Sequence, residues 1–190
     1  MSPRTNDRTP RLRAPPITPP FHVVLVEPEI PPNTGNVARL CAATQSPLHL
    51  VGHLGFRIDE QSVRRAGVDY WHLVDVRQHV NFPAFMHVFC KESGLPSDEA
   101  GLAAARARLH LFTAVTNQSY TRSTFRPGDA LVFGKESVGL PDEMLAEYND
   151  RLVGIPTLGA VRSLNLANAV GIALFEALRS CGALDVTHQG

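Results

Sequence analysis

Asparagine, glycine and charged residues gather in three short segments whose composition suits a nucleotide-like ligand. They are residues 33–39 (Asn-Thr-Gly-Asn-Val-Ala-Arg), 133–140 (Phe-Gly-Lys-Glu-Ser-Val-Gly-Leu) and 155–169, which contains Arg-Ser-Leu-Asn-Leu-Ala-Asn. Glycine lets backbone amides approach a ligand closely, and asparagine offers both donors and acceptors. A ligand that joins an adenosine to an amino acid needs that mixture. One segment alone is weak evidence, so the elements that position all three decide the interpretation.

Alternating hydrophobic patterns predict the strands and helices that position these segments. Strands are expected at residues 21–26, 48–51, 73–76, 109–115, 130–133 and 152–155, and helices at 33–44, 60–66, 82–91, 99–108, 142–147 and 165–179. This alternation predicts a single α/β domain with a largely parallel sheet. Open sheets of this kind bind ligands beyond the carboxyl ends of their strands, where the three segments fall.

The domain is expected to span residues 21–182. Residues 1–20 form an Arg- and Pro-rich stretch that cannot bury a core and is predicted to be a disordered tail, and residues 183–190 form a short C-terminal tail. Residues 93–108 are an elaborated connection to which we assign no chemistry.

Periodicity gives the first and last helices defined faces. Asn33 or Thr34 is expected to cap the first helix. Its apolar face is formed by Val37, Leu40, Cys41 and Thr44. Arg39 lies about 200° around the helix from Val37 and therefore points elsewhere. Gly171 inside the last helix suggests close backbone packing there.

Composition narrows the class of protein. The chain has 190 residues, 44% of them hydrophobic, and its 18 Lys and Arg balance its 18 Asp and Glu. A dedicated nucleic-acid coat protein usually has a basic excess, although a local basic patch stays open. Three separated cysteines without C-x-x-C spacing indicate reduced thiols. With no apolar run of about 20 residues and no secretory signal, we expect a cytoplasmic protein without a membrane span.

Common nucleotide and metal motifs do not fit. Gly139 is followed by Leu140-Pro141 rather than by the Lys-Ser or Lys-Thr of a Walker loop. No G-x-G-x-x-G follows the first strand, which disfavours a dinucleotide-dependent oxidoreductase. His49 and His53 lack a third ligand and a shared helix face, so no metal site is expected.

The three segments, in this order and spacing, resemble the SPOUT methyltransferases, specifically the branch that methylates 2′-hydroxyls of tRNA and rRNA. Residues 27–36 (Glu-Pro-Glu-Ile-Pro-Pro-Asn-Thr-Gly-Asn) and 64–70 (Arg-Arg-Ala-Gly-Val-Asp-Tyr) look like the small TrmL-type members, which methylate the wobble nucleotide of leucine tRNAs. The resemblance implies S-adenosylmethionine as cofactor, a tRNA cytidine or modified uridine as target, a homodimer formed through the first and last helices, and a deep C-terminal trefoil knot. The hydrophobic pattern alone would predict an unknotted sheet.

The resemblance also implies which residues act. The catalytic candidates are Arg39, Asn33, Glu136, Ser163 and Asn165. Arg39 matches an arginine proposed as a general base, but a guanidinium with a pKa above about 12 is better suited to orienting a phosphate and stabilising an oxyanion. Glu136 would orient Arg39 or an asparagine. Ala167 and Phe175 depart from the family pattern, which has serine and tyrosine there.

Cofactor and RNA contacts follow from the same resemblance. The expected cofactor positions are Ala114, Thr116, Gly134, Ile155 and Ser163, and the expected RNA contacts are Arg64, Arg65 and Arg162. Each candidate has an ordinary structural alternative: a helix cap for the asparagines and the serine, and a solvated side chain for Glu136 and the arginines. At the level of function, methylation of another tRNA or rRNA site and a non-catalytic RNA-binding role also stay open.

Overall fold

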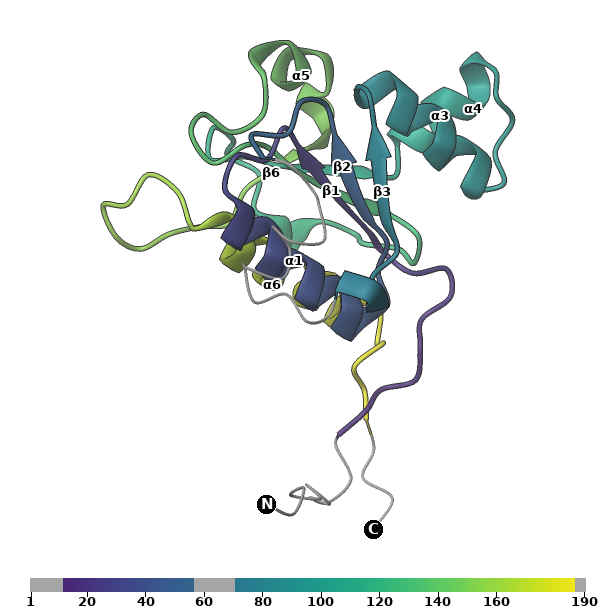
Figure 1. Ribbon diagram of the computed structural model, residues 1–190, viewed down its shortest axis with the longest axis horizontal. Coiled ribbons are helices and arrows are strands. Elements are labelled where there is room, and N and C mark those ends of the chain that lie inside the picture. The colour runs from purple at the N-terminus through teal and green to yellow at the C-terminus, as the bar shows by residue number, and fades with distance from the viewer. Residues whose placement is uncertain (1–11, 57–70, 187–190) are drawn as a thin grey trace.

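A six-stranded parallel sheet organises the protein in the computed structural model, which describes residues 12–56 and 71–186 (Figure 1). The strands are β1 His22–Val26, β2 Leu48–Val51, β3 Val76–His79, β4 Leu109–Phe112, β5 Ala130–Phe133 and β6 Leu152–Val153. Their order across the sheet is β3-β2-β1-β5-β4-β6, and each neighbouring pair is parallel. The predicted single α/β domain with a parallel sheet is confirmed.

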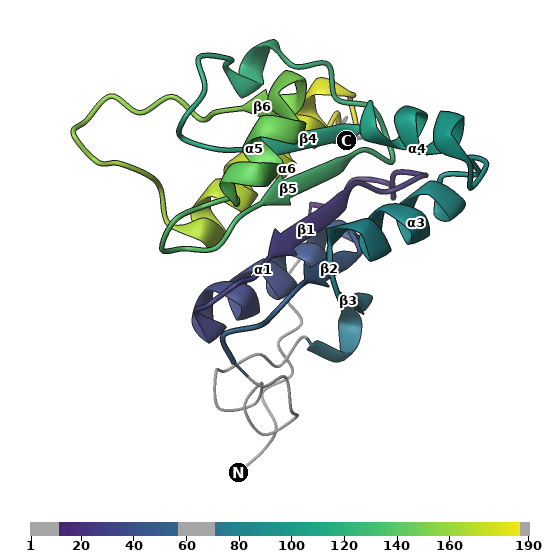
Figure 2. The same ribbon diagram turned by 90° about the horizontal axis from the view of Figure 1, so that it is seen from above.

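Helices cover both faces of the sheet. They are α1 Pro31–Thr44, α3 Phe82–Glu92, α4 Glu99–Arg106, α5 Asp142–Glu147 and α6 Leu166–Ser180, with 3-10 helices η1 Trp71–Leu73, η2 Tyr120–Arg122 and η3 Asn149–Arg151. Helices α1 and α6 lie side by side on one face, and α3, α4 and α5 lie on the other (Figures 1 and 2). The result is a three-layer arrangement with the sheet in the middle.

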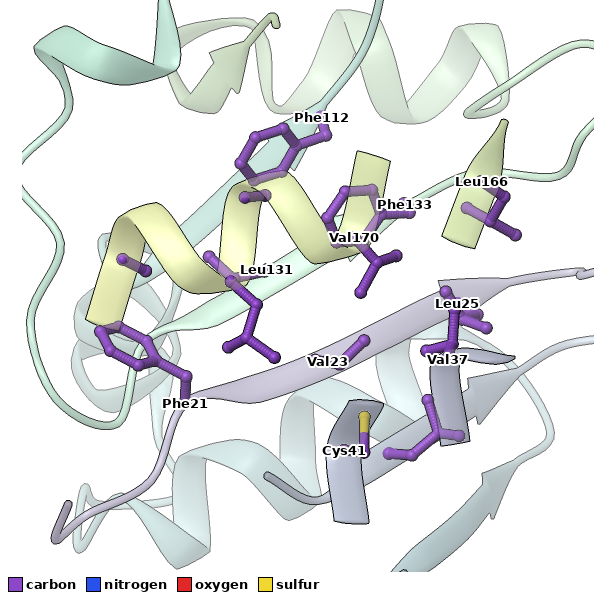
Figure 3. Close-up of a cluster of buried hydrophobic side chains, with 14 of the residues drawn as sticks. Phe21, Val23, Leu25, Val37, Cys41, Phe112, Leu131, Phe133, Leu166 and Val170 are labelled. Atoms are coloured by element: carbon purple, nitrogen blue, oxygen red, sulfur yellow. The ribbon is translucent and has the colours of Figure 1, made fainter. Parts of the chain in front are cut away.

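Strand β1 contributes to both cores because successive side chains of a strand point to opposite faces. Val23 and Leu25 pack with α1 and α6, as Figure 3 shows, whereas Val24 and Val26 pack on the other face with α3. All four are at most 5% exposed. Burying each such side chain contributes roughly 1.5–3 kcal/mol, so the continuous apolar run of β1 stabilises both layers.

Helix α1 begins earlier than its sequence suggests. Its first residues are Pro31 and Pro32, and Ile30 is the N-cap, without a side-chain hydrogen bond of its own. Asn33 and Thr34 therefore lie inside the helix, and their predicted role as N-cap is wrong. Proline is well suited to the first helical turn because it lacks the N–H that would have no partner there.

Three expected strands have different bounds. The strand predicted at residues 73–76 is wrong: that stretch begins in η1, and β3 follows at Val76–His79. The strands predicted at 109–115 and 152–155 are shorter in the structure, where β4 ends at Phe112 and β6 ends at Val153. Beyond these residues both segments leave the sheet at its carboxyl edge. The helix predicted at residues 60–66 lies outside the described residues.

The last helix is confirmed at Leu166–Ser180, but the close backbone packing expected at Gly171 is not found among the residues that the structure describes. A methyl group added there would meet, at 4.0 Å, only the Cδ2 atom of Leu40. Within residues 12–56 and 71–186, no helix combines the length and apolarity needed to cross a membrane. Cys41 and Cys90 are buried and Cys181 is partly buried, and all three are free thiols.

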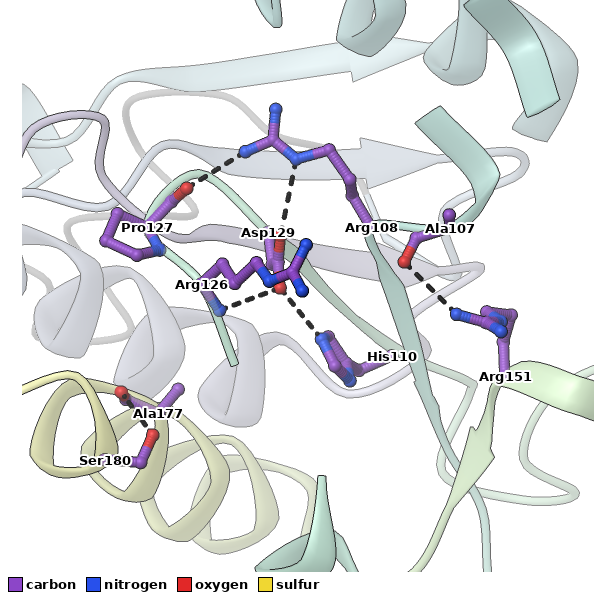
Figure 4. Close-up of polar contacts among 9 residues, drawn as sticks. All are labelled: Ala107, Arg108, His110, Arg126, Pro127, Asp129, Arg151, Ala177 and Ser180. Carbon is purple, nitrogen blue, oxygen red and sulfur yellow. Dashed lines mark hydrogen bonds and ion pairs between the residues drawn. The ribbon is translucent and has the colours of Figure 1, made fainter. Parts of the chain in front are cut away.

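A buried carboxylate ties the amino edge of the sheet together (Figure 4). Asp129, 3% exposed, accepts hydrogen bonds from Arg108 Nε (3.3 Å), His110 Nε2 (3.0 Å) and the backbone N–H of Arg126 (2.9 Å). Arg108 also donates to the Pro127 carbonyl at 3.0 Å. These bonds join the start of β4 to the turn before β5, where β5 is aligned with β1.

Three histidines form a hydrogen-bonded chain between the sheet and α3. His22 Nδ1 lies 2.9 Å from His49 Nε2, and His49 Nδ1 lies 2.9 Å from His79 Nε2. Burial lowers the pKa of His22 to about 4, helped by the nearby charges of Arg77 and Arg108, with Asp75 acting in the opposite direction. Burial also lowers the pKa of His49 to about 2, with further contributions from the neighbouring histidines and Arg77. A neutral imidazole has one N–H, so His49 donates one of its bonds and accepts the other.

The three hydrogen-bonded histidines make the stability of the fold sensitive to acid. In the unfolded chain both histidines take up protons below their ordinary pKa of 6.5, whereas in the fold His22 stays neutral to about pH 4 and His49 to about pH 2. Stability is therefore retained above pH 6.5 and falls as the pH drops below it, by about 1.4 kcal/mol per pH unit for each histidine. Denaturant unfolding at pH 7 and pH 5 measures the loss. We expect the free energy of unfolding to depend less steeply on pH in His49→Gln than in the wild type. In His87→Asn, which replaces an exposed histidine, the pH dependence should be that of the wild type. Equal pH dependence in His49→Gln and the wild type would contradict this account.

Candidate active site

The candidate site lies at the carboxyl edge of the sheet, where β1 and β5 end side by side. Leu25 of β1 is paired with Phe133 of β5, so the segments that follow, residues 27–30 and 134–140, leave the sheet next to one another. In this doubly wound order the chain continues in one direction from β1 and in the other from β5. Ligands bind at such a point of divergence.

Glu136 connects these two segments. Its Oε2 accepts the backbone N–H of Glu29 at 2.8 Å, and its Oε1 accepts from the backbone of Ile30 at 3.3 Å and from Asn33 Nδ2 at 2.9 Å. Its carboxylate therefore lies just before the positive end of α1, where a negative charge is stabilising. Glu136 is hydrogen-bonded on both oxygens and is not a freely solvated loop acid.

Asn33 is held in one orientation between Glu136 and Asn165. Glu136 Oε1 already accepts a backbone N–H, so the Asn33 amide group must face it with its NH₂. The Asn33 Oδ1 then accepts from Asn165 Nδ2 at 3.0 Å. Asn165 is also the N-cap of α6, since its Oδ1 accepts from Ala167 N at 3.0 Å and from Asn168 N at 3.4 Å. The structure thus joins three predicted site residues, 132 positions apart at the extremes, in one chain of hydrogen bonds.

Two further contacts join the segments after β1 and β5. Lys135 Nζ lies 3.0 Å from Glu27 Oε2, and this hydrogen bond raises the pKa of Lys135. Glu29 Oε2 accepts the backbone N–H of Ser137 at 3.1 Å. Glu27 has a φ of 49°, a left-handed conformation that costs a non-glycine residue about 1 kcal/mol or more and turns the chain out of β1. Sequence reasoning missed Glu29, Lys135 and Ser137, although the charged residues beside both strand ends were a visible signal.

Gly134 is required by the loop it begins. Lys135 and Gly139 exchange backbone hydrogen bonds of 3.1 and 2.9 Å, which close a tight turn. A methyl group on Gly134 would lie 2.0 Å from the carbonyl carbon of Gly139 and 2.1 Å from Leu140 N. A glycine is therefore needed at position 134 for the loop to pack on itself, whether or not a ligand also approaches its backbone.

The other predicted cofactor positions follow β4 and β6. Gly154 N donates to Gln118 O at 2.8 Å and Tyr120 N donates to Gly154 O at 3.0 Å, so the segment after β4 runs beside the end of β6. This brings Thr116 within 3.0 Å of the position of a methyl group on Gly154, one residue before Ile155. Ala114 is exposed in the same segment.

Exposed aliphatic side chains surround this edge, and sequence reasoning did not single them out. They are Val115 (70% exposed), Val138 (72%), Leu158 (108%) and Val161 (61%), one or two on each loop after β4, β5 and β6. Figures 1 and 2 show the loop that carries Leu158 and Val161 extending away from the sheet. Apolar surface beside polar amide groups suits a ligand that carries both an aromatic base and polar groups.

Three other predicted site residues, Arg39, Arg162 and Ser163, lie in α1 and in the loop before α6. Arg39 is exposed on α1, six residues after Asn33 and therefore about 9 Å further along the helix and about 240° around it. Arg162 and Ser163 are exposed in the loop between β6 and α6. Arg64 and Arg65 lie outside the described residues.

The cavity of about 540 Å³ lies at the opposite, amino edge of the sheet, between the starts of β1, β2 and β3. Its charged residues are Asp75, Arg77 and Glu92, and Arg77 is paired with both acids. Among the described residues, no group of three His, Cys, Asp or Glu side chains could hold a metal ion.

Comparison with known proteins identifies the family. Residues 20–175 match the model of the SpoU rRNA methylase family. The chain belongs to the SpoU family. A tRNA (cytidine(34)-2′-O)-methyltransferase from Burkholderia ambifaria is 42% identical over 163 residues, which cover 85% of this chain and 96% of the relative.

Solved structures agree with this assignment. A structure described as giving insights into the 2-OH methylation of C/U34 on tRNA superposes with a TM-score of 0.70, at 46% identity, covering 85% of this chain and 95% of that one. An AdoMet-bound rRNA methyltransferase from Sinorhizobium meliloti superposes with a TM-score of 0.66, at 26% identity, covering 86% of this chain and 57% of that one. The predicted SPOUT kinship is confirmed, whereas the knot stays a prediction.

The packing around Gly134 gives a testable consequence. Gly134→Ala forces the turn of residues 135–139 to move, because the added methyl group overlaps backbone atoms at about 2 Å. We expect a loss of about 1–3 kcal/mol in the free energy of unfolding, together with loss of S-adenosylmethionine binding. Thermal unfolding and calorimetric titration measure the two effects. Gly159→Ala is the matched control, since its methyl group meets nothing within 4 Å; equal behaviour of the two variants would disprove the packing argument.

Proposed function

We propose that this SpoU-family chain transfers a methyl group from S-adenosylmethionine to the ribose 2′-hydroxyl of the wobble nucleotide of tRNA, cytidine or a modified uridine of leucine tRNAs. The observation that carries the proposal is the chain of hydrogen bonds from Glu136 through Asn33 to Asn165 at the carboxyl edge. The relative named tRNA (cytidine(34)-2′-O)-methyltransferase supports the choice of substrate, because this chain matches nearly the whole length of that relative.

The residues at this edge fit the cofactor. When bound, S-adenosylmethionine supplies a methyl group on a sulfonium, which transfers in line to an oxygen nucleophile. The segments containing Ala114, Thr116, Gly134, Ile155 and Ser163 would hold it, with aliphatic surface from Val115 and Val138. These residues would supply mostly backbone contacts and exclude water from the reacting atoms.

The asparagine chain orients the ribose. Asn33 and Asn165 have fixed amide groups, so they can present donors and acceptors to a hydroxyl without reorganisation. Holding the 2′-hydroxyl at near-attack distance supplies much of the rate in a transfer of this kind. A site built for the 2′-hydroxyl also rejects DNA.

Arg39 acts on the phosphate beside the target ribose. Arg39 lies exposed on α1. Its positive charge would stabilise the oxyanion that develops as the 2′-hydroxyl loses its proton. Arg162, and in the sequence Arg64 and Arg65, would add phosphate contacts, which supply affinity and salt dependence rather than sequence choice.

The function is tested by methyl transfer from labelled S-adenosylmethionine to total bacterial tRNA, followed by nucleoside mapping. A 2′-O-methyl group at the wobble position is the expected product. Transfer to rRNA or to another tRNA position would refute the choice of substrate. Cofactor binding with no transfer to any RNA would refute the enzymatic role in favour of a non-catalytic RNA-binding factor.

Replacing Arg39 tests its role. We expect Arg39→Ala to lower kcat by about a hundredfold or more, since a positioned charge at a developing oxyanion is worth that much, while the fold is kept. Single-turnover methylation of tRNA measures the effect, and circular dichroism checks the fold. Lys91→Ala, which removes an exposed charge on α3, is the control. Substantial residual activity of Arg39→Ala would remove this residue from the mechanism.

A homodimer formed through α1 and α6 completes the proposal. Ile172 (39% exposed) and Phe175 (45%) leave an apolar strip on α6, beside Gly171 with its open surface. Such a strip is suited to a second copy, because glycine permits close approach and exposed aromatic residues anchor interfaces. We assign the protein to the cytoplasm, as expected of a tRNA-modifying enzyme.

The oligomeric state gives the corresponding prediction. Phe175→Glu places a charge on the apolar strip and should shift the protein from dimer to monomer at micromolar concentration, because burying an unpaired carboxylate is costly. Light scattering coupled to size exclusion measures the mass. Val88→Glu on α3, at a position 37% exposed on the other face of the sheet, should stay dimeric. A monomeric wild type would rule the interface out.

A further inference from the structure

The segments after β1 and β5 hold each other in both directions. Glu136 of the second segment accepts the backbone N–H of Glu29 in the first, and Glu29 accepts the backbone N–H of Ser137 in the second, at 2.8 and 3.1 Å. We call this reciprocal pair of bonds the Glu29–Glu136 clamp. The ion pair between Lys135 and Glu27 lies next to it in the sequence, on the other side of Glu136.

This arrangement fixes Glu136 from both sides. Its preceding residue, Lys135, is tied by its side chain to Glu27, and its following residue, Ser137, is tied by its backbone to Glu29. The turn that carries all three is closed by the backbone bonds between Lys135 and Gly139. The Glu136 carboxylate consequently points at the start of α1, where it meets Asn33.

Glu29 is not placed to support the core. It is only partly buried, its bond to Ser137 is exposed to solvent, and it belongs to neither buried hydrophobic cluster. An exposed hydrogen bond contributes little to global stability, because water replaces a lost partner. Because Glu29 restrains this loop without stabilising the core, it affects chiefly the position of the loop's own side chains, above all Glu136.

We propose that Glu29 is a positioning residue for methyl transfer: it holds the turn of residues 135–139 so that Glu136 orients Asn33 toward the reacting ribose. This rests on the proposed function. Glu29 acts through Glu136 and Asn33 and does not touch the substrate. An error of about 1 Å in such positioning can cost about a hundredfold in rate, so a partly buried acid in this place is of catalytic consequence.

Two substitutions separate positioning from general stability. Glu29→Ala removes the acceptor for Ser137 N–H, whereas Glu29→Gln keeps an acceptor oxygen at the same reach. We expect Glu29→Ala to lower kcat about tenfold or more, with KM for tRNA and cofactor within about twofold and with the melting temperature nearly unchanged. Glu29→Gln should recover most of kcat. Glu99→Ala and Glu99→Gln, at an exposed acid on α4, are the matched controls and should behave as the wild type.

A second readout needs no activity. Amide hydrogen exchange in residues 134–140 of the full chain should be faster in Glu29→Ala than in Glu29→Gln or in the wild type. Unchanged exchange overturns the clamp. Faster exchange with wild-type kcat, or an effect on KM alone, overturns the positioning role. A wild-type protein that methylates no tRNA refutes the proposed function and the catalytic part of this inference, whereas the exchange result judges the clamp separately.

Discussion

The carboxylate of Glu136 is the contact on which the candidate site depends. It lies between two segments that are adjacent only because β1 and β5 pair in the middle of the sheet. From there it accepts the backbone N–H groups of Glu29 and Ile30 just before α1, and it fixes the amide of Asn33. Each of these contacts would require another acceptor if Glu136 were absent, since helix N-termini and buried amides need partners. The same carboxylate therefore joins two segments of the fold and orients a side chain of the candidate site.

The sheet provides the rigidity that such a contact requires. Strand β1 is buried on both faces and joins the two hydrophobic clusters, so the end of β1 has little freedom to move. The amino edge is held by the Asp129 contacts, and the histidine chain runs from the start of β1 to the end of β3 on the face that α3 covers. Polar groups at the two edges serve different purposes: Asp129 aligns the starts of the strands, and Glu136 joins the segments that follow them.

Much of this was predictable, and the failures have physical reasons. The β-branched and leucine-rich runs identified β1, β2 and β5 well, because strands buried on both faces leave a strong local signal. The strand bounds at the carboxyl edge were too long, because Val115 and Ile155 are residue types typical of strands, whereas their backbone belongs to the loops that follow β4 and β6. The N-cap of α1 was misassigned to Asn33 or Thr34, because the helix begins at Pro31 and its N-cap, Ile30, is not a residue type that marks a cap in a sequence. Strand β3 was misplaced because its sequence, Val-Arg-Gln-His, is more polar than the Leu-Val-Asp-Val stretch that begins three residues earlier.

By itself, the sequence determined the class of fold and the chemical character of the site: alternating patterns specify a parallel α/β sheet, and three Asn- and Gly-rich segments specify what lies at its edge. Only the tertiary structure decided how those segments meet. It brought Asn33 into hydrogen bonds with both Glu136 and Asn165. It also brought Glu29, Lys135 and Ser137 into the same cluster of contacts. The reason is that local patterns report which face of an element is buried, whereas the contacts of a site join residues more than 100 positions apart, and strand order alone brings those residues together.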